Sequence, residues 1–416
     1  MKNYKENIMR EEKKKIEEKI FDNIIITVSN QYQKEYLNKQ ILQKKYIIPA
    51  DTKCEIVVEK KKLGSGGAIL NIIKNIDTKS KKILLINSAG KCKRMPLYAD
   101  KGKICIPSFI NEDSILLEEI LNEASKIGKK IEDGILIVSG DCITQFEELD
   151  KNIYQNNTAF IVLADEKYGE KHGVFVTENK KLKKALQKES KEVLNSENAV
   201  DKNGNVKIDT GIIYFNQNTI NSLRKIKFDD NIILNAYTDF VYPLALEKSF
   251  DEYLKQKTEN TGILKIIEKR KEIWNALENQ TLDIEELHNG KFIHYGTVRE
   301  FLEIASRKYE KDNIVINSII YGKLSKGCYI ENSTILNNCK VGENSIILDS
   351  IVDLDVPKNI LVKTIEHLDG YYTIVLENSK ENESILDIKI EEISKDKKEA
   401  CQKALRAYKK KKDSEE

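Results

Sequence analysis

Short apolar runs alternate with longer amphipathic segments from residue 22 to about 215. Seven of the runs are rich in Ile and Val and too short for helices, and we predict them as strands at 23–29, 55–59, 82–88, 134–140, 159–164, 173–178 and 211–216. The segment 114–130 instead places aliphatic residues such as Ile120 and Leu121 on one stripe, with charges opposite, as expected of a helix that covers a sheet. The alternation predicts an α/β fold with a largely parallel sheet.

After residue 217 the pattern becomes mostly helical, through 231–249 and 264–280, and then its period changes again. Aliphatic side chains now recur six residues apart, with one five-residue step, at Leu324, Ile330, Ile335, Val341 and Ile347. Asn-Ser pairs that suit turns accompany this repeat at 317–318, 332–333 and 344–345. The repeat favours a hexapeptide-type β-helix over the alternative, an antiparallel sheet of short Ile-rich strands.

Composition excludes several classes of partner. The 416 residues carry 69 Lys and Arg against 67 Asp and Glu, a formal charge of +2, so no overall field attracts nucleic acid or an acidic membrane. Seven scattered cysteines without CxxC spacing indicate neither a disulfide framework nor a zinc site, and they fit a reducing compartment. No run approaches about 18 apolar residues, and residues 1–20 lack the apolar segment of a signal peptide. We therefore expect a cytoplasmic protein without nucleic-acid or membrane partners.

The stretch LGSGGAIL, residues 63–70, gathers three of only 19 glycines between a predicted strand and a predicted helix. Glycines at such a place let backbone N–H groups approach phosphate oxygens closely, and the helix adds its positive end. The candidate nucleotide-binding residues here are Gly64, Ser65, Gly66 and Gly67. The stretch is neither a Walker loop, because no Gly-Lys-Ser/Thr closes it, nor a dinucleotide fingerprint, because Ile69 stands where a third glycine is needed. A tight turn without a ligand is the alternative.

A second stretch, LLINSAGKCKRMPLYADKGK at 84–103, adds cations after a strand. It resembles the loop that reads approximately G-G-x-x-x-R-x-x-P…K in sugar-nucleotide pyrophosphorylases. Cleavage of a triphosphate needs fixed cations where negative charge builds up. We predict that Gly90 binds the nucleotide and that Arg94 and Lys103 are catalytic. For either cation alone, an ordinary surface charge is the alternative.

A carboxylate at the end of a buried strand suggests a metal site. Asp141, in VSGDC at 138–142, follows such a strand, where α/β folds place ligand contacts. One carboxylate can hold one face of Mg²⁺ while water and phosphate oxygens complete the octahedron. A turn aspartate that caps the next segment is the alternative. Asp239, in AYTDFVYPLALE at 236–247, is the second candidate ligand.

Nine stretches, taken in order over roughly residues 21–355, resemble the L-fucose-1-phosphate guanylyltransferases, also called GDP-L-fucose pyrophosphorylases. They are FDNIIITVSN, LGSGGAIL, ILLINSAGKCKRMPLYADKGK, VSGDC, HGVFV, LQKES, DTGIIYF, TDFVYPLAL and FIHYGTVREFL. The resemblance implies a Rossmann-like nucleotidyltransferase domain at 1–300 and a left-handed parallel β-helix at 301–377. A charged helical tail, which we expect to be solvated and frayed, follows at 378–416. The implied reaction makes GDP-L-fucose and pyrophosphate from GTP and L-fucose 1-phosphate with Mg²⁺.

The resemblance also implies roles for single residues. Gly64 to Gly67 and the turn at 90–94 would cradle the nucleotide, and Arg94 with Lys103 would stabilise the triphosphate. Lys188, in LQKES, resembles the lysine that contacts the sugar phosphate.

The metal would be held by Asp141 and Asp239. The sequence departs from the usual pattern at Ala89, Cys92 and Glu189. These departures bear on base and sugar specificity more than on the chemistry.

Other functions stay open at this point. One is a related nucleotidyltransferase with another nucleotide or sugar, and another is a non-catalytic protein that binds sugar nucleotides. A hexapeptide acyltransferase is disfavoured, because residues 311–357 contain no histidine. His172 and His294 are expected to be structural, since the attacking phosphate is already an anion. We expect the coil to be structural or an assembly surface, and a separate sugar kinase to act in the same pathway. Whether the protein forms a homo-oligomer stays open.

Overall fold

The computed structural model describes residues 18–43, 48–49, 51–76, 81–111, 114–147, 149, 154–260, 262–309, 311–378 and 392–415. The prediction about a signal peptide at 1–20 therefore falls mostly outside the described residues, as does the part of the tail from 379 to 391. In the described ranges, no helix is long and apolar enough to cross a membrane.

The first half of a nine-stranded sheet is parallel, in the order β2-β1-β3-β4. Its strands are β1 (Asn23–Val28), β2 (Lys53–Val58), β3 (Lys82–Asn87) and β4 (Gly134–Ser139). The Ile, Leu and Val side chains of β1, β3 and β4 are buried on both faces, because helices cover both sides of a parallel sheet, whereas Val57 and Val58 of the edge strand β2 are only partly buried. In this register Asn87 pairs with Ser139, so both strands end at the same edge.

The second half of the sheet is mixed, in the order β9-β6-β10-β8-β7. Its strands are β6 (Thr158–Asp165), β7 (Gly173–Glu178), β8 (Lys181–Gln187), β9 (Asn205–Phe215) and β10 (Asp283–Glu286). Strand β9 runs antiparallel to both β4 and β6, so the predicted largely parallel sheet is correct for one half only. Two further strands, β5 (Cys142–Gln145) and β11 (Lys291–His294), form a small antiparallel sheet.

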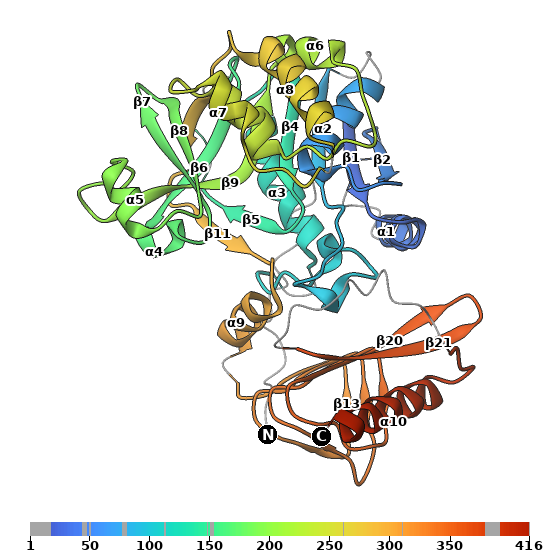
Figure 1. The fold of residues 1–416 in the computed structure, drawn as a ribbon. Helices are drawn as coiled ribbons and strands as arrows, with labels where there is room; N and C mark the ends of the chain where they lie inside the picture. Colours follow the sequence, from blue (N-terminus) through green and yellow to red (C-terminus); the bar gives the residue numbers. More distant parts are fainter. Residues whose placement is uncertain are drawn as a thin grey trace, which may run out of the picture.

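Helices form a layer on each face of the large sheet (Figure 1). Leu37 of α1 (Gln31–Gln43) and the apolar stripe of α3 (Leu116–Gly128) pack in one core cluster, which confirms the helix predicted over 114–130. The second cluster contains α2 (Gly64–Asn75), α6 (Gln217–Lys225) and α8 (Ile263–Leu277). Shorter helices are α4 (Glu166–Gly169), α5 (Lys191–Ser196) and α7 (Phe250–Leu254), with 3₁₀ turns at Pro96–Tyr98, Lys103–Cys105 and Tyr242–Leu244 and a π-helical turn at Ala236–Val241.

The C-terminal region is a coil of short parallel strands. The largest of its three sheets contains β12 (Ile314–Ile316), β15 (Tyr329–Glu331), β18 (Ile346–Leu348) and β20 (Ile360–His367), with β21 (Gly370–Glu377) antiparallel at its edge. The other two sheets contain β13 (Ile319–Ile320), β16 (Thr334–Ile335) and β19 (Ile351–Val352), and β14 (Lys323–Leu324) with β17 (Lys340–Val341). Strands of successive turns of the coil pair in parallel, which excludes the antiparallel alternative for these strands. The hand of the coil stays a prediction.

Asparagines explain why the coil turns at regular intervals. Asn317, Asn332 and Asn344 have φ angles of 44°, 49° and 54°, a left-handed conformation that asparagine tolerates better than most residues. Their side chains form hydrogen bonds between successive turns of the coil, and Asn317 Nδ2 donates to Asn332 Oδ1 at 2.7 Å. The Asn-Ser pairs of the sequence are therefore the corners of the coil.

Helix α10 (Lys397–Glu415) corrects the expectation of a solvated, fraying tail. It lies along the coil (Figure 1), and Cys401 and Leu405 are fully buried in the same cluster as the aliphatic side chains of the coil. The charge-rich sequence concealed this apolar face, which is only about one residue wide at each turn.

Candidate active site

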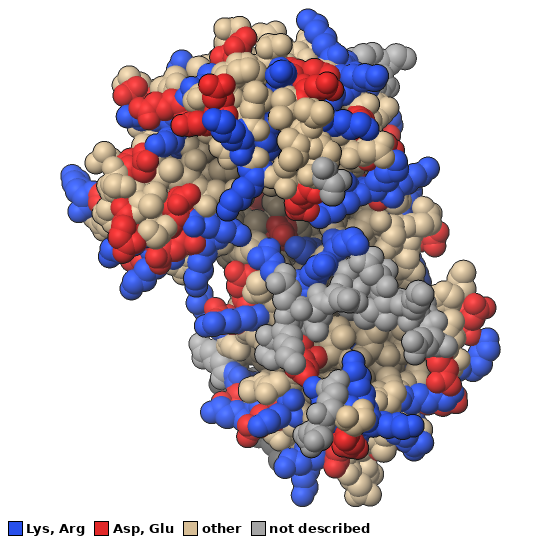
Figure 2. Space-filling model, viewed as in Figure 1, with Lys and Arg blue, Asp and Glu red and all other residues tan. Residues whose placement is uncertain are grey.

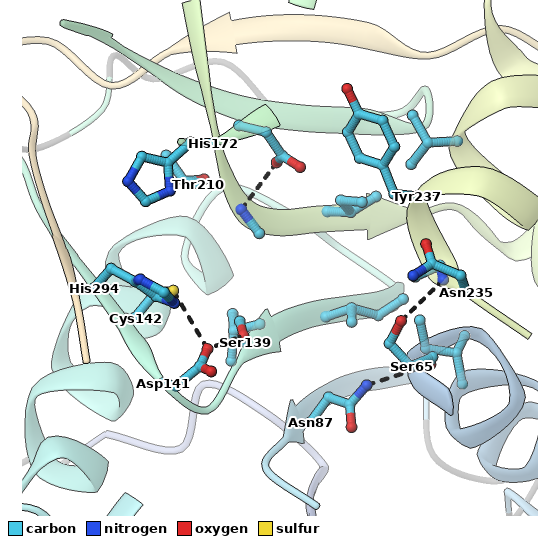
Figure 3. Close-up of a pocket in the computed structure, with 18 of the residues that line it drawn as sticks. Ser65, Asn87, Ser139, Asp141, Cys142, His172, Thr210, Asn235, Tyr237 and His294 are labelled. Carbon is cyan, nitrogen blue, oxygen red and sulfur yellow. Dashed lines mark hydrogen bonds between the residues drawn. The ribbon is translucent and has the colours of Figure 1, made fainter. Parts of the chain in front are cut away.

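A cavity of about 320 Å³ opens at the edge where β3 and β4 end. Figure 3 shows that side chains reach it from both halves of the large sheet and from the small sheet. Its polar lining consists of Ser65, Asn87, Ser139, Asp141, Cys142, His172, Gln187, Asp209, Thr210, Asn235, Tyr237 and His294. In the space-filling view, Lys and Arg side chains border the hollow in the middle of the molecule (Figure 2).

The carboxylate of Asp141 is fixed in the cavity by two side-chain contacts. Its Oδ2 lies 2.8 Å from the Nζ of Lys103, and its Oδ1 accepts a hydrogen bond from the hydroxyl of Ser139 at 2.7 Å. Burial alone would raise the pKa of Asp141, but the charges of Lys103 and His294 hold it well below its usual range. Burial likewise opposes the charge of Lys103, yet Asp141 raises the pKa of its ammonium. The structure thus brings together Lys103 and Asp141, and the pair is charged at neutral pH.

Arg94 and Gly90 lie farther out in the same loop. Both are exposed, and neither lines the cavity. The carbonyl of Arg94 accepts the N–H of Val298 at 3.1 Å, where α9 (Val298–Tyr309) begins. The role of Arg94 toward a triphosphate therefore stays a prediction.

The glycines of the 63–70 stretch form the first turn of α2 rather than a separate phosphate loop. The N–H groups of Gly66 and Gly67 both donate to the carbonyl of Leu234, at 2.9 and 3.4 Å. A Cβ on Gly64, whose φ is +72°, would lie 2.3 Å from the same oxygen. These glycines let two backbone segments approach closely, so the cradle predicted at Gly66 and Gly67 is not supported.

Ser65 is the polar residue of that stretch that lines the cavity, beside Ile69. Its hydroxyl accepts the N–H of Ala236 at 3.0 Å, and its carbonyl accepts Nδ2 of Asn87 at 3.3 Å. Asn87 ends β3 and Asn235 precedes the π-helical turn. Together they form a wall of amide and hydroxyl groups that suits a ligand with several hydrogen-bonding atoms.

Asp239 does not reach the cavity, which corrects its predicted role as a metal ligand. Its Oδ1 lies 2.9 Å from Nε of the buried Arg270, and its Oδ2 accepts the N–H of Asn235 at 2.7 Å. A buried carboxylate paired in this way serves to anchor the π-helical turn.

Two histidines that we expected to be merely structural face the cavity (Figure 3). Strand β11 pairs with β5 so that His294 lies opposite Cys142, and the rings of His172 and His294 meet edge to face, with centroids 5.5 Å apart. Burial and the neighbouring His294 lower the pKa of His172 to about 4, so this ring is neutral at pH 7.

Glu300 is the carboxylate that contacts His294. Burial opposes ionisation of Glu300, but hydrogen bonding to His294 and Thr297 lowers its pKa to about 2. Nδ1 of His294 lies 3.3 Å from the Glu300 carboxylate, and this contact orients the imidazole ring toward the cavity. The sequence offered no local signal for this arrangement, since 152 positions separate His294 from Cys142.

A β-bulge in β9 brings a second carboxylate to the cavity. The pairing with β6 shifts register after Phe160, which leaves Thr210 and Gly211 as extra residues. Gly211, with a φ of +71°, donates its N–H to Asp209 at 2.9 Å. Burial raises the pKa of Asp209 to about 6 despite this hydrogen bond. Sequence reasoning did not identify Asp209.

Lys188 follows β8 immediately, beside the cavity residue Gln187. It is exposed, has a φ of +56°, and its N–H donates to the carbonyl of His172 at 3.2 Å. Its place at the rim suits an anionic ligand, and its predicted contact with a sugar phosphate stays a prediction.

The departures at Cys92 and Ala89 have structural explanations. Burial raises the pKa of Cys92 to about 11, and its side chain packs with Ile365 and Ile374 of the C-terminal region. The N–H of Ala89 donates to the hydroxyl of Thr27 at 3.3 Å. Cys92 is therefore a packing residue and not a nucleophile.

Among the described residues, Asp141, Cys142 and His294 place potential metal-binding atoms within 4.8 Å of one another. The carboxylate of Asp141 fits Mg²⁺, which is usually held by one or two carboxylates with water and phosphate oxygens. Burial and the charge of Asp141 raise the pKa of Cys142 well above its usual range, so its thiol is a poor ligand. Imidazole nitrogen suits softer metals than Mg²⁺.

A family model described as the fucose pyrophosphorylase domain matches residues 77–384. The fucose-1-phosphate guanylyltransferase of Homo sapiens is 24% identical over 414 residues, which cover 80% of this chain and 67% of that protein. The corresponding protein of Mus musculus is 22% identical, with coverage of 80% and 69%.

Among solved structures, HddC from Yersinia pseudotuberculosis is 12% identical, with coverage of 69% of this chain and 78% of that chain and a TM-score of 0.35. A second structure of the same protein, complexed with GMP-PN, is 11% identical, covers 68% of this chain and 98% of that chain, and has a TM-score of 0.32.

Proposed function

The chain belongs to the fucose pyrophosphorylase family, and on that premise we propose that it is a sugar-1-phosphate nucleotidyltransferase that makes GDP-L-fucose and pyrophosphate from GTP and L-fucose 1-phosphate. The observation that carries the proposal is the ion pair of Lys103 and Asp141 beside the cavity. A cation and a carboxylate next to a cavity with a polar wall suit the transfer of a charged phosphoryl group.

In the proposed reaction, an oxygen of the sugar 1-phosphate attacks the α-phosphorus of the nucleotide, and pyrophosphate leaves in line. The nucleophile is already an anion, so positioning and charge neutralisation account for most of the rate. Lys103 offsets the charge that grows as pyrophosphate departs. Ser139 fixes the orientation of the Asp141 carboxylate through its hydrogen bond of 2.7 Å.

The two sides of the cavity suit different substrates. Ser65, Asn87 and Asn235 offer amide and hydroxyl groups for the nucleoside, at the side where α2 begins. Lys188 and Asp209 come from the mixed half of the sheet, where a cation can meet the sugar phosphate and a carboxylate can accept sugar hydroxyl groups.

Mg²⁺ is part of the proposal, with Asp141 as the residue that would hold it. When bound, the ion would neutralise charge on the nucleotide phosphates. Lys103 pairs with Asp141 and keeps this carboxylate ionised, which a metal ligand requires.

We also propose a left-handed winding of the coil, a cytoplasmic location, a separate sugar kinase that supplies the sugar 1-phosphate, and a homo-oligomeric state.

The test is pyrophosphate release from each of four nucleoside triphosphates combined with several sugar 1-phosphates. We expect the highest kcat/KM for GTP with L-fucose 1-phosphate. A higher value for another pair would replace the substrates but keep the reaction. Binding of the sugar nucleotide without pyrophosphate release from any pair would favour a non-catalytic binding protein instead.

A further inference from the structure

The segment 88–103, which follows β3 and is called the loop below, carries Lys103 at its end. This loop contacts the coil through a buried lysine. Lys363, in β20, is fully buried, and its Nζ donates to the carbonyl of Leu97 at 2.7 Å. The same Nζ lies 2.8 Å from Oδ1 of Asp100, an electrostatic contact rather than an aligned hydrogen bond. A buried ammonium needs such partners because its desolvation is costly. Both of these partners belong to the loop, and a third, Asp349, lies in the coil with its Oδ2 at 3.7 Å from the same Nζ.

Two neighbouring turns of the coil contact the same loop through charged side chains. Asp349 pairs with Lys101 of the loop, with 2.9 Å between Oδ2 and Nζ. Glu331 accepts hydrogen bonds from the hydroxyls of Tyr98, in the loop, and Tyr329, in the coil. Glu331, Leu348 and Lys363 are successive partners in one sheet, and Asp349 directly follows Leu348. Charged side chains from three neighbouring turns of the coil therefore reach one segment.

A glycine turns the loop from the coil toward the cavity. Asp100 and Lys101 face the coil, whereas Lys103, two residues on, faces Asp141. Gly102, between them, has a φ of +92°, which other residues adopt only with strain. Figure 1 shows this segment, in cyan, between the α/β layers and the coil. A displacement of Asp100 and Lys101 would therefore move the backbone of Lys103.

We propose that the coil is a positioning element for catalysis, in which Lys363, assisted by Asp349 and Glu331, holds the loop so that Lys103 meets the transferred phosphate. Lys363 touches no substrate and acts through Lys103, which makes it a positioning residue. The inference rests on the proposed nucleotidyl transfer. It goes beyond the expectation of a coil that serves only structure or assembly.

The test compares Lys363→Met with Lys269→Met. Lys269 is also a buried lysine, 5% exposed, that bonds a backbone carbonyl and pairs with Glu272 at 2.7 Å, but it lies in α8, away from the loop. We expect Lys363→Met to lower kcat at least about tenfold, because small misplacements of a reacting group are costly, while both KM values change less than about twofold. Lys269→Met should keep the wild-type kcat even where its melting temperature falls.

A double-mutant cycle of Lys101→Met and Asp349→Asn decides the question if Lys363→Met does not fold. Both side chains are partly exposed, so their loss is better tolerated. Each single change should lower kcat about threefold or more, and the double variant should be no worse than the poorer single one, because each change already removes the contact that the two side chains share. Wild-type kcat in Lys363→Met, or in all members of the cycle, overturns the inference. Failure of the proposed function is distinct, because the wild-type protein would then release no pyrophosphate.

Discussion

In the parallel half of the large sheet, the polar residues that face the cavity come at or just after the ends of strands, whereas in the mixed half most of them come from a bulge and from connections, and Gln187 at the end of β8 is the exception. Asn87 and Ser139 end β3 and β4, and Asp141 follows two residues later. On the other side, Asp209 adjoins the bulge of β9, and His172 lies just before β7.

The two halves of the sheet hold their cavity residues in different ways. Hydrogen-bonded register fixes the parallel side, because neighbouring parallel strands end together. The mixed side depends on irregular backbone and on pairing between distant segments, such as β5 with β11. We therefore expect changes on the parallel side to act on the chemical step and changes on the mixed side to act on recognition of the sugar phosphate.

The largest effect is expected from Asp141→Asn, on the parallel side. The change keeps the shape of the side chain but removes its charge from Lys103 and from Mg²⁺. We expect kcat to fall at least about a hundredfold, or about 2.7 kcal/mol, because charge stabilisation of the transition state is lost. Asp133→Asn, at the opposite end of β4, is the matched control and should leave kcat unchanged. Equal kcat values for the two variants would remove Asp141 from the reaction.

The next effect is expected at the seam where α2 meets the segment 232–236. Gly64→Ala should lower the free energy of unfolding by about 1–3 kcal/mol, because its φ is +72° and its Cβ would meet the carbonyl of Leu234. Gly262→Ala is the control, since no atom lies within 4 Å of its added Cβ. Chemical denaturation measures both. Equal losses in the two variants would contradict the close-packing role of Gly64.

A smaller effect tests recognition on the mixed side. Lys188→Ala should raise the KM for the sugar 1-phosphate about tenfold, the value of one charge-assisted contact, and should change the nucleotide KM less than about twofold. Lys180→Ala provides the control, because Lys180 is also exposed and also has a positive φ, of 62°. Should Lys188→Ala raise both KM values equally, the two sides would not divide the substrates.

The smallest effect is a pH dependence at Asp209. Burial raises its pKa from 3.8 to about 6, so the folded protein binds this proton more tightly than the unfolded chain does. Stability from this group is complete below pH 4 and is lost as the pH rises through 6. Asp209→Asn should therefore gain on the order of 1 kcal/mol in unfolding free energy relative to wild type between pH 4 and pH 7. A difference between the two proteins that does not vary with pH would show an ordinary pKa.

The sequence predicted the parallel side better than the mixed side for a physical reason. The strands of the parallel half are continuous aliphatic runs, and Asp141 directly follows one of them, so its place could be inferred from nearby residues. Strand β8 contains three lysines and β10 contains one isoleucine among acids, so neither has a strand pattern, and both depend on tertiary pairing.

Long-range contacts also explain the incorrect expectations. The partner of Asp239 is Arg270, 31 residues away, and the partner of Asp100 is Lys363, in the coil. Glycines at 64–67 have the same sequence signature whether they approach a phosphate or a carbonyl of the chain itself. Local pattern identifies the close approach, and only the fold identifies what approaches.

The fate of the phosphorus atoms of GTP is the sharpest test of nucleotidyl transfer at this cavity. Wild-type protein and Lys103→Met are each given GTP labelled at the α- or the γ-phosphorus, with L-fucose 1-phosphate and Mg²⁺. Wild type should place the α-label in the sugar nucleotide and the γ-label in pyrophosphate, in equal amounts, and Lys103→Met should do so at least about a hundredfold more slowly. Release of the γ-label as inorganic phosphate, or an unchanged rate in Lys103→Met, would contradict nucleotidyl transfer at this cavity.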